Sequence, residues 1–294
     1  MFDCNETLER ARARNVTDAL AEDIGRGDWT GRLVAADSRL HARVIVREQA
    51  VLCGRPWFDE CLSRLDPDAR VLWHAGEGDA VSPQRCVCEI EALARALLAA
   101  ERPALNFMQL LSATATVTRR YVEAIAGTSP NARGCSILDT RKTLPGLRLA
   151  QKYAVRVGGG LNQRLALYDG ILIKENHIAA AGGVTAALRA ARALDSGVPI
   201  QIEVETLAQL DEALAQGAGD ILLDNFPLDD MRRAVSITAG RAVLEVSGGV
   251  DLTRVRNIAA TGVDRISIGR LTKDVAAVDF SMRVAGRTTG DRWP

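Results

Sequence analysis

Charged and glycine residues follow short apolar runs at regular intervals in the second half of the chain. The run Ile137-Leu138 leads into Asp139-Thr140-Arg141-Lys142, and the run Ile171-Leu172-Ile173 leads into Lys174. Later apolar runs end in the same way, at Glu203, Asp224, Ser247 and Gly269. In a barrel of parallel strands, the carboxyl ends of the strands carry the active site. We therefore expect these side chains to share one site.

Four cations belong to this pattern, namely Arg141, Lys142, Arg164 and Lys174. Positive charges that gather in a poorly solvated pocket repel one another, and a bound polyanion relieves that repulsion. A single such residue would be read as an ordinary surface charge, whereas four at equivalent positions favour an anion site. The sequence therefore predicts a substrate with several negative charges.

Two carboxylates and two glycine loops follow the cations. Glu203 and Asp224 are suited to sugar hydroxyls or to a Mg²⁺ ion that keeps several waters. The segments Ser247-Gly248-Gly249 and Ile268-Gly269-Arg270 follow the last two strands, where barrels bind phosphate through backbone N–H groups and helix N-termini. The set suits a phosphorylated sugar that meets a small carboxylate. Because no Ser-His-Asp set is present, catalysis would depend on positioning and electrostatic stabilisation.

The spacing of these residues indicates the elements that must position them. Consecutive strand ends are far enough apart for a helix of about three or four turns in each interval. Strands that alternate with such helices predict βα units around a parallel sheet. We therefore expect an α/β protein with a C-terminal βα barrel.

The first third of the chain has a different pattern. Polar and apolar residues alternate over 39–53, which predicts a strand with one solvent-exposed face. Further strands are expected near 71–73 and 86–90, and helices over 56–65, 92–100 and 104–126, the last two separated at Pro103. These elements predict an N-terminal α+β domain of residues 1–114, joined by the C-terminal residues 272–294. The barrel domain would comprise residues 115–271.

Composition excludes some classes of function. Lysine plus arginine equals aspartate plus glutamate at 37 each, so no net charge attracts the protein to nucleic acid or to a membrane. The first residues lack a signal-peptide pattern, and no apolar run is long enough to span a bilayer, so a soluble cytoplasmic protein is expected. The six cysteines lack the paired spacing of a zinc site and are interpreted as reduced thiols.

Several segments together resemble the quinolinate phosphoribosyltransferase family. The segments that carry the resemblance are Asp139–Arg148, Gly158–Gly160, Leu172–His177, Glu203–Glu205, Leu223–Phe226 and Glu245–Val250. The likeness covers essentially the whole chain, from the Glu22–Thr30 segment to Met282. It implies a type II phosphoribosyltransferase, which converts quinolinate and phosphoribosyl pyrophosphate, with Mg²⁺, to nicotinate mononucleotide, CO₂ and pyrophosphate in NAD biosynthesis.

The resemblance also implies roles for individual residues. The catalytic set would be Lys142, Lys174, Glu203 and Asp224, with the two lysines near the junction of quinolinate and pyrophosphate and the two acids holding ribose hydroxyls and Mg²⁺. The carboxylates of quinolinate would bind Arg102, Arg141 and Arg164. The 5′-phosphate would bind Ser247, Gly248, Gly249 and Gly269. The expected substrate-binding set is completed by Thr140, Gln163, Ile268 and Arg270.

A homodimer with shared active sites, or a higher oligomer, is implied as well. The N-terminal domain of one subunit would cap the barrel of the other, and Arg102 would reach the partner's site. Spacing alone favours an ordinary solvated arginine at the start of a helix. The two readings of Arg102 therefore differ.

The chain departs from the usual family pattern at three positions. Gln163 stands where histidine is usual, Pro103 replaces threonine, and Arg270 replaces a small residue. Glutamine can donate a hydrogen bond to a carboxylate but cannot carry a charge, which puts in doubt any mechanism that needs an imidazolium there. His177 could act at a helix start or in catalysis.

Three alternative functions remain open. A related pyrophosphorylase with another acceptor, such as the paralogues encoded with molybdenum transport, would depart from the family within Lys174-Glu175-Asn176-His177. A Schiff-base aldolase would need Lys174 to be neutral. A phosphosugar-binding barrel without catalysis would lack the acids, yet Glu203 and Asp224 are both present.

Overall fold

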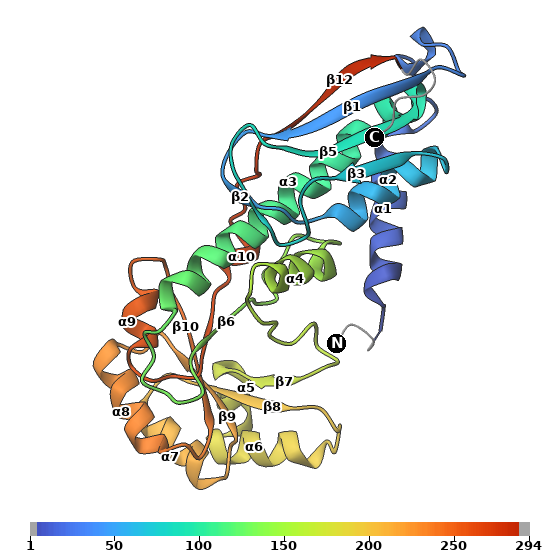
Figure 1. Cartoon of the computed structure of the whole chain (residues 1–294). Helices are drawn as coiled ribbons and strands as arrows, with labels where there is room; N and C mark the ends of the chain where they lie inside the picture. The colour runs from blue at the N-terminus through green and yellow to red at the C-terminus, as the bar shows by residue number, and fades with distance from the viewer. Residues whose placement is uncertain (1–4, 288–294) are drawn as a thin grey trace. The chain divides into compact units, whose positions relative to one another are not determined.

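The computed structural model describes residues 5–287, which form two compact units (Figure 1). Unit 1 contains the described residues up to 117, residues 144–158, and the described residues from 274 onward. Unit 2 contains residues 118–143 and 159–273. The segment 144–158 therefore groups with unit 1, although the chain on both sides of it belongs to unit 2. No helix within residues 5–287 has the length and apolar character needed to cross a membrane.

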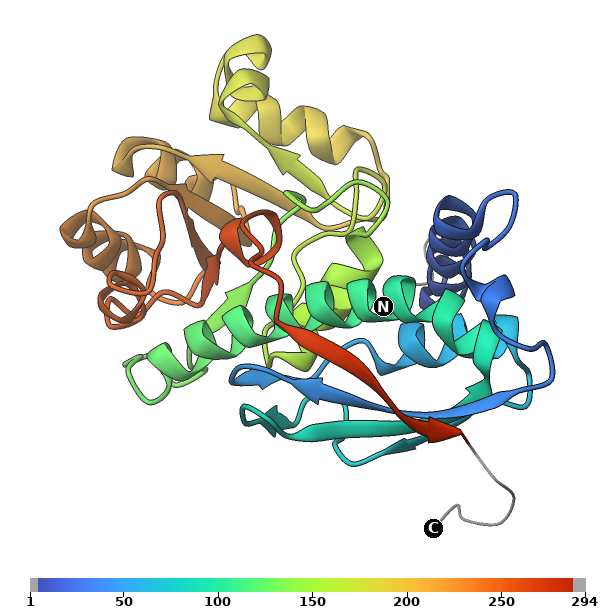
Figure 2. The same cartoon turned by 90° about the horizontal axis from the view of Figure 1, so that it is seen from above.

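Unit 1 is built on an antiparallel sheet, as the sequence predicts. Its strand order is β12 (Phe280–Arg287), β1 (Arg39–Val46), β5 (Cys86–Leu93) and β3 (Arg70–Trp73). The last strand of the chain lies beside β1, which Figure 2 shows as a red strand next to a blue one. A short ribbon pairs β2 (Ala50–Val51) with β4 (Ala80–Val81).

Helices cover one face of this sheet. They are α2 (Arg55–Leu65) and the first part of α3 (Ala94–Ile125), while α1 (Leu8–Ile24) and α4 (Arg148–Val157) pack against α2. Val44 and Ile90 of the sheet pack in one core with Trp57, Phe58 and Met108 of the helices, and all five are buried. Alternate residues of β1 and β5 point to the opposite face, which is polar and partly exposed. The alternation read from the sequence therefore produces a sheet with one apolar and one polar face.

Helix α3 corrects one prediction. The sequence predicted an interruption at Pro103, but Pro103 lies inside a continuous helix of 32 residues. Proline removes one backbone donor and usually bends a helix. Here Pro103 and its neighbours Ala104 and Leu105 are buried in unit 1, so packing offsets the lost hydrogen bond. Arg102 consequently lies in the middle of a helix rather than at a helix start.

Unit 2 has a six-stranded parallel sheet of βα units, which confirms the predicted barrel-like architecture. The strand order is β6 (Ser136–Leu138), β11 (Arg265–Ser267), β10 (Val243–Ser247), β9 (Asp220–Asp224), β8 (Ile200–Val204) and β7 (Ile171–Ile173). The helices that follow strands are α5 (Glu175–Ala181), α6 (Val184–Ala193), α7 (Leu207–Ala215), α8 (Leu228–Thr238), α9 (Val255–Ala259) and α10 (Arg270–Lys273). Beyond β6, a parallel bridge joins Leu138 to Leu161.

Only one of the two glycine loops leads directly into a helix, and that helix is short. Helix α9 begins only at Val255, so a loop separates it from Gly248-Gly249. Helix α10 does begin directly after Gly269, but it has only four residues. Backbone N–H groups of the loops, rather than two full helix N-termini, are therefore the available phosphate donors in this region.

Gly54 illustrates how unit 1 constrains its backbone. Gly54 precedes α2 with a φ of 106°, and a Cβ at this position would lie 3.2 Å from the Cα atom of Met108. Both the left-handed backbone and the close approach to α3 therefore require glycine.

We expect Gly54→Ala to destabilise unit 1 by about 1–3 kcal/mol beyond the cost of backbone strain, because the methyl group must displace helix α3. Gly25→Ala is the matched control, since Gly25 also has a positive φ (49°) but its nearest contact to a Cβ is Ala21 O at 4.0 Å. Thermal and urea unfolding of both variants would measure the difference. Equal destabilisation would show that packing against Met108 carries no cost.

Candidate active site

A polar cavity of about 780 Å³ lies at the carboxyl ends of the strands of unit 2. Lysines, carboxylates and glycine loops from most of the strand ends line it. Eleven of the residues expected from the sequence line this cavity: Thr140, Lys142, Lys174, Glu203, Asp224, Ser247, Gly248, Gly249, Ile268, Gly269 and Arg270. The structure thus brings the predicted phosphate loops, both acids and both lysines together.

Six further lining residues were not singled out from the sequence. They are Glu175, Glu205, Asn225, Val250, Ser267 and Lys273. The first five each lie within two residues of a predicted site residue, at a strand end or in the turn that follows. A rule that includes the neighbours of each strand-end residue would have found them. Lys273 carries no such signal, because it reaches the cavity only through the short helix α10.

Lys142 is held in place by neighbours on three sides. Its backbone N–H donates to Thr140 Oγ1 at 3.1 Å, and its carbonyl accepts from Thr272 Oγ1 at 2.7 Å. A Cβ on Gly269 would lie 3.0 Å from Lys142 Cδ. Gly269 therefore leaves the space through which the lysine side chain passes.

Lys174 and Glu203 form an ion pair within the cavity. The distance from Lys174 Nζ to Glu203 Oε2 is 3.0 Å, and the glutamate side chain is only 8% exposed. Burial raises the pKa of Glu203, the hydrogen bond and charge of Lys174 lower it, and a hydrogen bond with Glu175 and the charge of Asp224 raise it again, with a net rise. Glu203 is therefore a carboxylate whose charge is costly without a cation beside it.

The Ser247-Gly248-Gly249 loop packs closely against the end of β9. Gly248 has a φ of 99°, and a Cβ there would collide with the side-chain amide of Asn225. Asn225 itself donates its backbone N–H to Ser247 O at 3.0 Å and its side-chain amide to Asp224 Oδ2 at 2.8 Å. These bonds join the acidic strand end to the glycine loop.

His177 has a local role at the start of α5. Its Nδ1 accepts the backbone N–H of Lys174 at 2.9 Å, so this imidazole nitrogen caps the first turn of the helix. This geometry fixes the backbone at the strand end that carries Lys174. Of the two sequence readings of His177, the helix-start role is the one that a hydrogen bond supports.

The four predicted cations do not all line one cavity. Arg164 lines a separate cavity of about 390 Å³ in unit 2, and its guanidinium donates to Gly170 O at 2.8 Å. Burial lowers the pKa of Arg164, and the positive charge of Arg141 lowers it further. Lys142 and Lys174 therefore line the larger cavity, whereas Arg164 lines the smaller one.

Gln163 lies in the same smaller cavity and belongs to a side-chain network. The buried Asp139 accepts its backbone N–H at 3.0 Å, and its side-chain amide donates to Gln201 Oε1 at 2.8 Å. Gln201 in turn donates to Asp220 at 2.8 Å and to Glu245 at 3.0 Å. Gln163 thus has hydrogen-bond partners suited to an amide.

Arg102 belongs to unit 1, where it lines a cavity of about 340 Å³ with residues of α1 and of the 145–147 turn. The side chain is exposed and forms no ion pair within residues 5–287. An exposed arginine without an ion-pair partner in its own unit can bind an anion of another molecule.

The larger cavity can therefore bind a molecule with separate anionic and hydroxyl groups. Two lysines offer cationic donors, Glu203 and Asp224 offer acceptors, and the loops at Gly248-Gly249 and Gly269 leave room for close approach of the backbone. Carboxylate oxygens in this arrangement can also bind a divalent cation.

Both halves of the chain match known families. The family described as "Quinolinate phosphoribosyl transferase, N-terminal domain" matches residues 28–112, and "Quinolinate phosphoribosyl transferase, C-terminal domain" matches residues 114–283.

Individual relatives share the sequence and the fold over nearly their full length. The nicotinate-nucleotide pyrophosphorylase (carboxylating) of Mycobacterium leprae is 41% identical over 292 residues, covering 96% of this chain and 99% of the relative. The probable enzyme of the same name from Bacillus subtilis is 40% identical over 264 residues, 90% of each chain. The solved nicotinate-nucleotide pyrophosphorylase from Francisella tularensis has a TM-score of 0.88 and 44% identity, covering 93% of this chain and 96% of that chain.

Replacing Lys174 by alanine is expected to raise the pKa of Glu203, because the ammonium group lowers that pKa and is then lost. Carbon-13 NMR titration of labelled glutamate carboxyl groups would follow the change. Lys273→Ala serves as the control, since it removes another cation of the same cavity but not the ion-pair partner of Glu203. A pKa that stays unchanged or falls in Lys174→Ala would contradict the pairing.

Proposed function

This chain belongs to the quinolinate phosphoribosyltransferase family, and on that premise we propose that it makes nicotinate mononucleotide in NAD biosynthesis. The enzyme transfers the phosphoribosyl group of phosphoribosyl pyrophosphate to quinolinate and releases pyrophosphate and CO₂. One observation carries the proposal: lysines, paired acids and glycine loops line a single cavity at the carboxyl ends of the unit 2 strands.

The cavity of unit 2 would hold phosphoribosyl pyrophosphate. The 5′-phosphate would bind the loops at Ser247-Gly248-Gly249 and Gly269, where the absence of side chains allows backbone N–H groups to approach phosphate oxygens. Glu203 and Asp224 would accept hydrogen bonds from the ribose hydroxyls. Lys142 and Lys174 would lie against the pyrophosphate, where charge develops as it leaves.

The dicarboxylate would bind the arginine pair Arg141 and Arg164. Burial, and after it repulsion by Arg141, lowers the pKa of Arg164, and two carboxylate groups would offset both effects. Arg164 would have to exchange its hydrogen bond with Gly170 O for one with quinolinate. Gln163, which is next to Arg164, would donate a neutral hydrogen bond rather than a charged one.

We propose Mg²⁺ as the cofactor, held by Glu203 and Asp224. The donor set fits, because Mg²⁺ prefers carboxylate oxygens and retains several waters. The charge of Asp224 also raises the pKa of Glu203, and a cation between the two groups would reduce that repulsion. When bound, Mg²⁺ would offset negative charge on the pyrophosphate.

The residues of the chain act on the reaction through position and charge. In the transfer, the ring nitrogen of quinolinate forms a bond to C1′ of ribose, and pyrophosphate leaves with the electron pair of the broken C–O bond. Loss of the carboxylate next to that nitrogen then releases CO₂, and the ring carbon takes up a proton. Lysines that stabilise the departing charge and arginines that orient the dicarboxylate would supply the rate enhancement without a covalent intermediate.

We further propose a dimer in which Arg102 completes the quinolinate site of the partner subunit. The exposed position of Arg102 on α3 and the lack of an ion pair for it within the described residues support this role. A guanidinium that binds a carboxylate through two parallel hydrogen bonds provides both charge and orientation.

A direct assay tests the reaction. The protein is incubated with quinolinate, phosphoribosyl pyrophosphate and Mg²⁺, and nicotinate mononucleotide and CO₂ are measured together. We expect equal amounts of both products, and none without Mg²⁺. Nicotinate in place of quinolinate tests the alternative acceptor, and turnover with nicotinate but not with quinolinate would overturn the proposal.

Gly269→Ala is expected to reduce kcat/KM by roughly tenfold or more, because the new methyl group displaces Lys142 from its path. Gly219→Ala is the matched control, since a Cβ there meets nothing within 4 Å. Activity equal to that of the control would mean that the position of Lys142 does not limit the reaction.

Mixed dimers test the role of Arg102. Arg102→Ala and Lys142→Ala are expected to be nearly inactive alone, yet a heterodimer of the two should recover about half of the wild-type activity if the sites act independently. One site of that heterodimer combines an intact Arg102 with an intact Lys142. Co-expression with two different tags allows its purification.

The control pairs Lys142→Ala with a subunit that carries both substitutions. This heterodimer contains no complete site and should remain inactive. If the first heterodimer is as inactive as its parents, Arg102 does not act across the dimer.

A further inference from the structure

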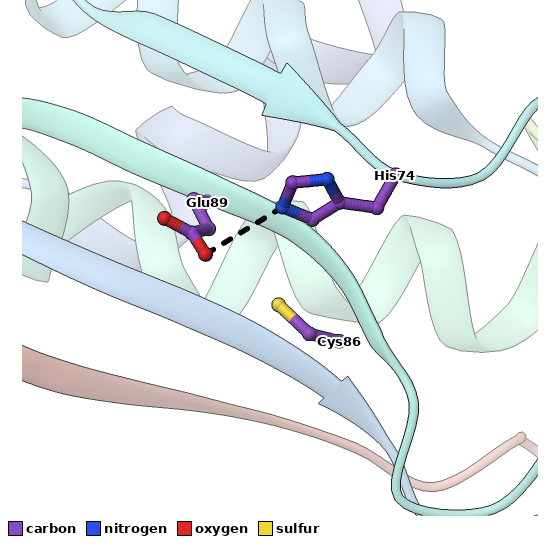
Figure 3. A group of neighbouring side chains, drawn as sticks. All are labelled: His74, Cys86 and Glu89. Atoms are coloured by element: carbon purple, nitrogen blue, oxygen red, sulfur yellow. Dashed lines mark ion pairs between the residues drawn. The ribbon is translucent and has the colours of Figure 1, made fainter. Parts of the chain in front are cut away.

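A cluster of metal-binding side chains lies on unit 1, and none of its members lines the cavity of unit 2. His74, Cys86 and Glu89 each offer one ligand atom, and these three atoms lie within 4.8 Å of one another (Figure 3). His74 Nε2 is 3.6 Å from Glu89 Oε1. A second imidazole, that of His41, lies outside this group and contacts the other carboxylate oxygen, with its Nε2 3.0 Å from Glu89 Oε2.

The sheet places these side chains on one face. His41 lies on β1, Cys86 and Glu89 lie on β5, and His74 follows β3, while β5 pairs with both neighbours. Regular alternation along β5 would put Cys86 and Glu89 on opposite faces. The register of β1 and β5 shifts by a bulge at Val44 and Ile45, opposite Cys88 and Cys86.

The bulge turns Cys86 toward the polar face. Val87 and Cys88 are consecutive buried residues, whereas Cys86 and Glu89 on either side of them are both partly exposed. Bulges often serve to redirect a side chain. This one separates Cys86 from Cys88 and brings its thiol beside the carboxylate and the imidazole.

We propose that His74, Cys86 and Glu89 form a Zn²⁺ site whose fourth position is filled by water. Nitrogen, sulfur and carboxylate oxygen are the ligands that Zn²⁺ uses in four-coordinate sites. Metal binding also explains the position of the Cys86 thiol, because the ion pair between Glu89 and histidine does not need a thiol beside it. Metal coordination would deprotonate the thiol, whose pKa is raised in the free protein by burial and by the Glu89 charge.

One cation competes with the metal. Arg43 Nε lies 3.3 Å from Glu89 Oε1, the oxygen that also faces His74. The Arg43 side chain is 53% exposed, so it can move into solvent when a metal binds. Removing this charge should strengthen metal binding. If Glu89 had only a structural role, the same change would remove one of its ion-pair partners and weaken its contacts.

Cobalt provides a spectroscopic probe of the site. The full-length protein is freed of metal with a chelator and titrated with Co²⁺. We expect one equivalent to produce thiolate-to-cobalt absorption in the near ultraviolet together with visible bands of a four-coordinate ion, and Zn²⁺ to displace both. Quinolinate and phosphoribosyl pyrophosphate should leave these bands unchanged. An absence of thiolate-to-cobalt absorption would overturn the proposal.

Variants assign the ligands. Cys86→Ser should abolish the thiolate band and lower the Zn²⁺ affinity by roughly tenfold or more, and Glu89→Gln should lower the affinity to a similar extent. The control is Cys135→Ser, because Cys135 is another partly buried free thiol but lies in unit 2. Arg43→Ala should raise the affinity. Retention of the band in Cys86→Ser, or its loss in Cys135→Ser, would assign the metal elsewhere.

Stability provides a second measurement. A metal that binds only the folded state raises Tm, so Zn²⁺ should raise the Tm of wild-type protein and of Cys135→Ser but not of Cys86→Ser. Glu89→Gln covers the case in which Cys86→Ser fails to fold, and the same lack of a Zn²⁺-dependent rise is expected for it. An equal rise in every variant would overturn the assignment. Turnover of quinolinate by Cys86→Ser should equal that of the wild type, which separates this proposal from the catalytic one.

Discussion

The parallel register of the unit 2 strands is the constraint on which the larger cavity depends. Asp224 pairs with Ser247 at the ends of β9 and β10, and Glu203 lies on β8 beside Leu222 of β9. This register places an acid beside a glycine loop. The Lys174–Glu203 ion pair then joins β7 to β8 at the same edge. A slip of one residue in any of these strands would point its functional side chain away from the cavity.

Sequence reasoning predicted most of this arrangement because βα units concentrate their functional residues at strand ends. Lys174, Asp224 and Ser247 could be identified from the end of each apolar run alone. Arg164 was expected to share one cavity with Lys142 and Lys174 but lines a separate one, because its position depends on a loop held by Asp139 and on its own bond to Gly170. The continuity of α3 through Pro103 was also missed, since long-range packing overrides a local preference. The clustering of His74 with Cys86 depends on strand pairing and on a bulge, neither of which sequence spacing reveals.

The electrostatics of the site favour phosphoribosyl transfer over the other reactions that the sequence left open. A Schiff-base aldolase needs a neutral, desolvated lysine, whereas the ion pair with a nearly buried carboxylate favours a charged Lys174. A barrel that only binds phosphosugars has no need of a second acid beside Glu203. Burial, Glu175 and Asp224 raise the pKa of Glu203 against the opposing effect of Lys174, and a carboxylate perturbed in this way beside a second acid in a cavity is typical of a functional site.

The pairing of β12 with β1 has a consequence for synthesis on the ribosome. The first segment of unit 1 ends at residue 117, but the sheet of this unit is completed by residues 280–287, which are translated after all of unit 2. Until then β1 has an open edge that can pair with other nascent chains. Domains generally fold in the order in which they emerge, yet here the sheet that is translated first is the last to be finished. The nascent polypeptide therefore depends on its final strand, or on a chaperone, to protect that edge.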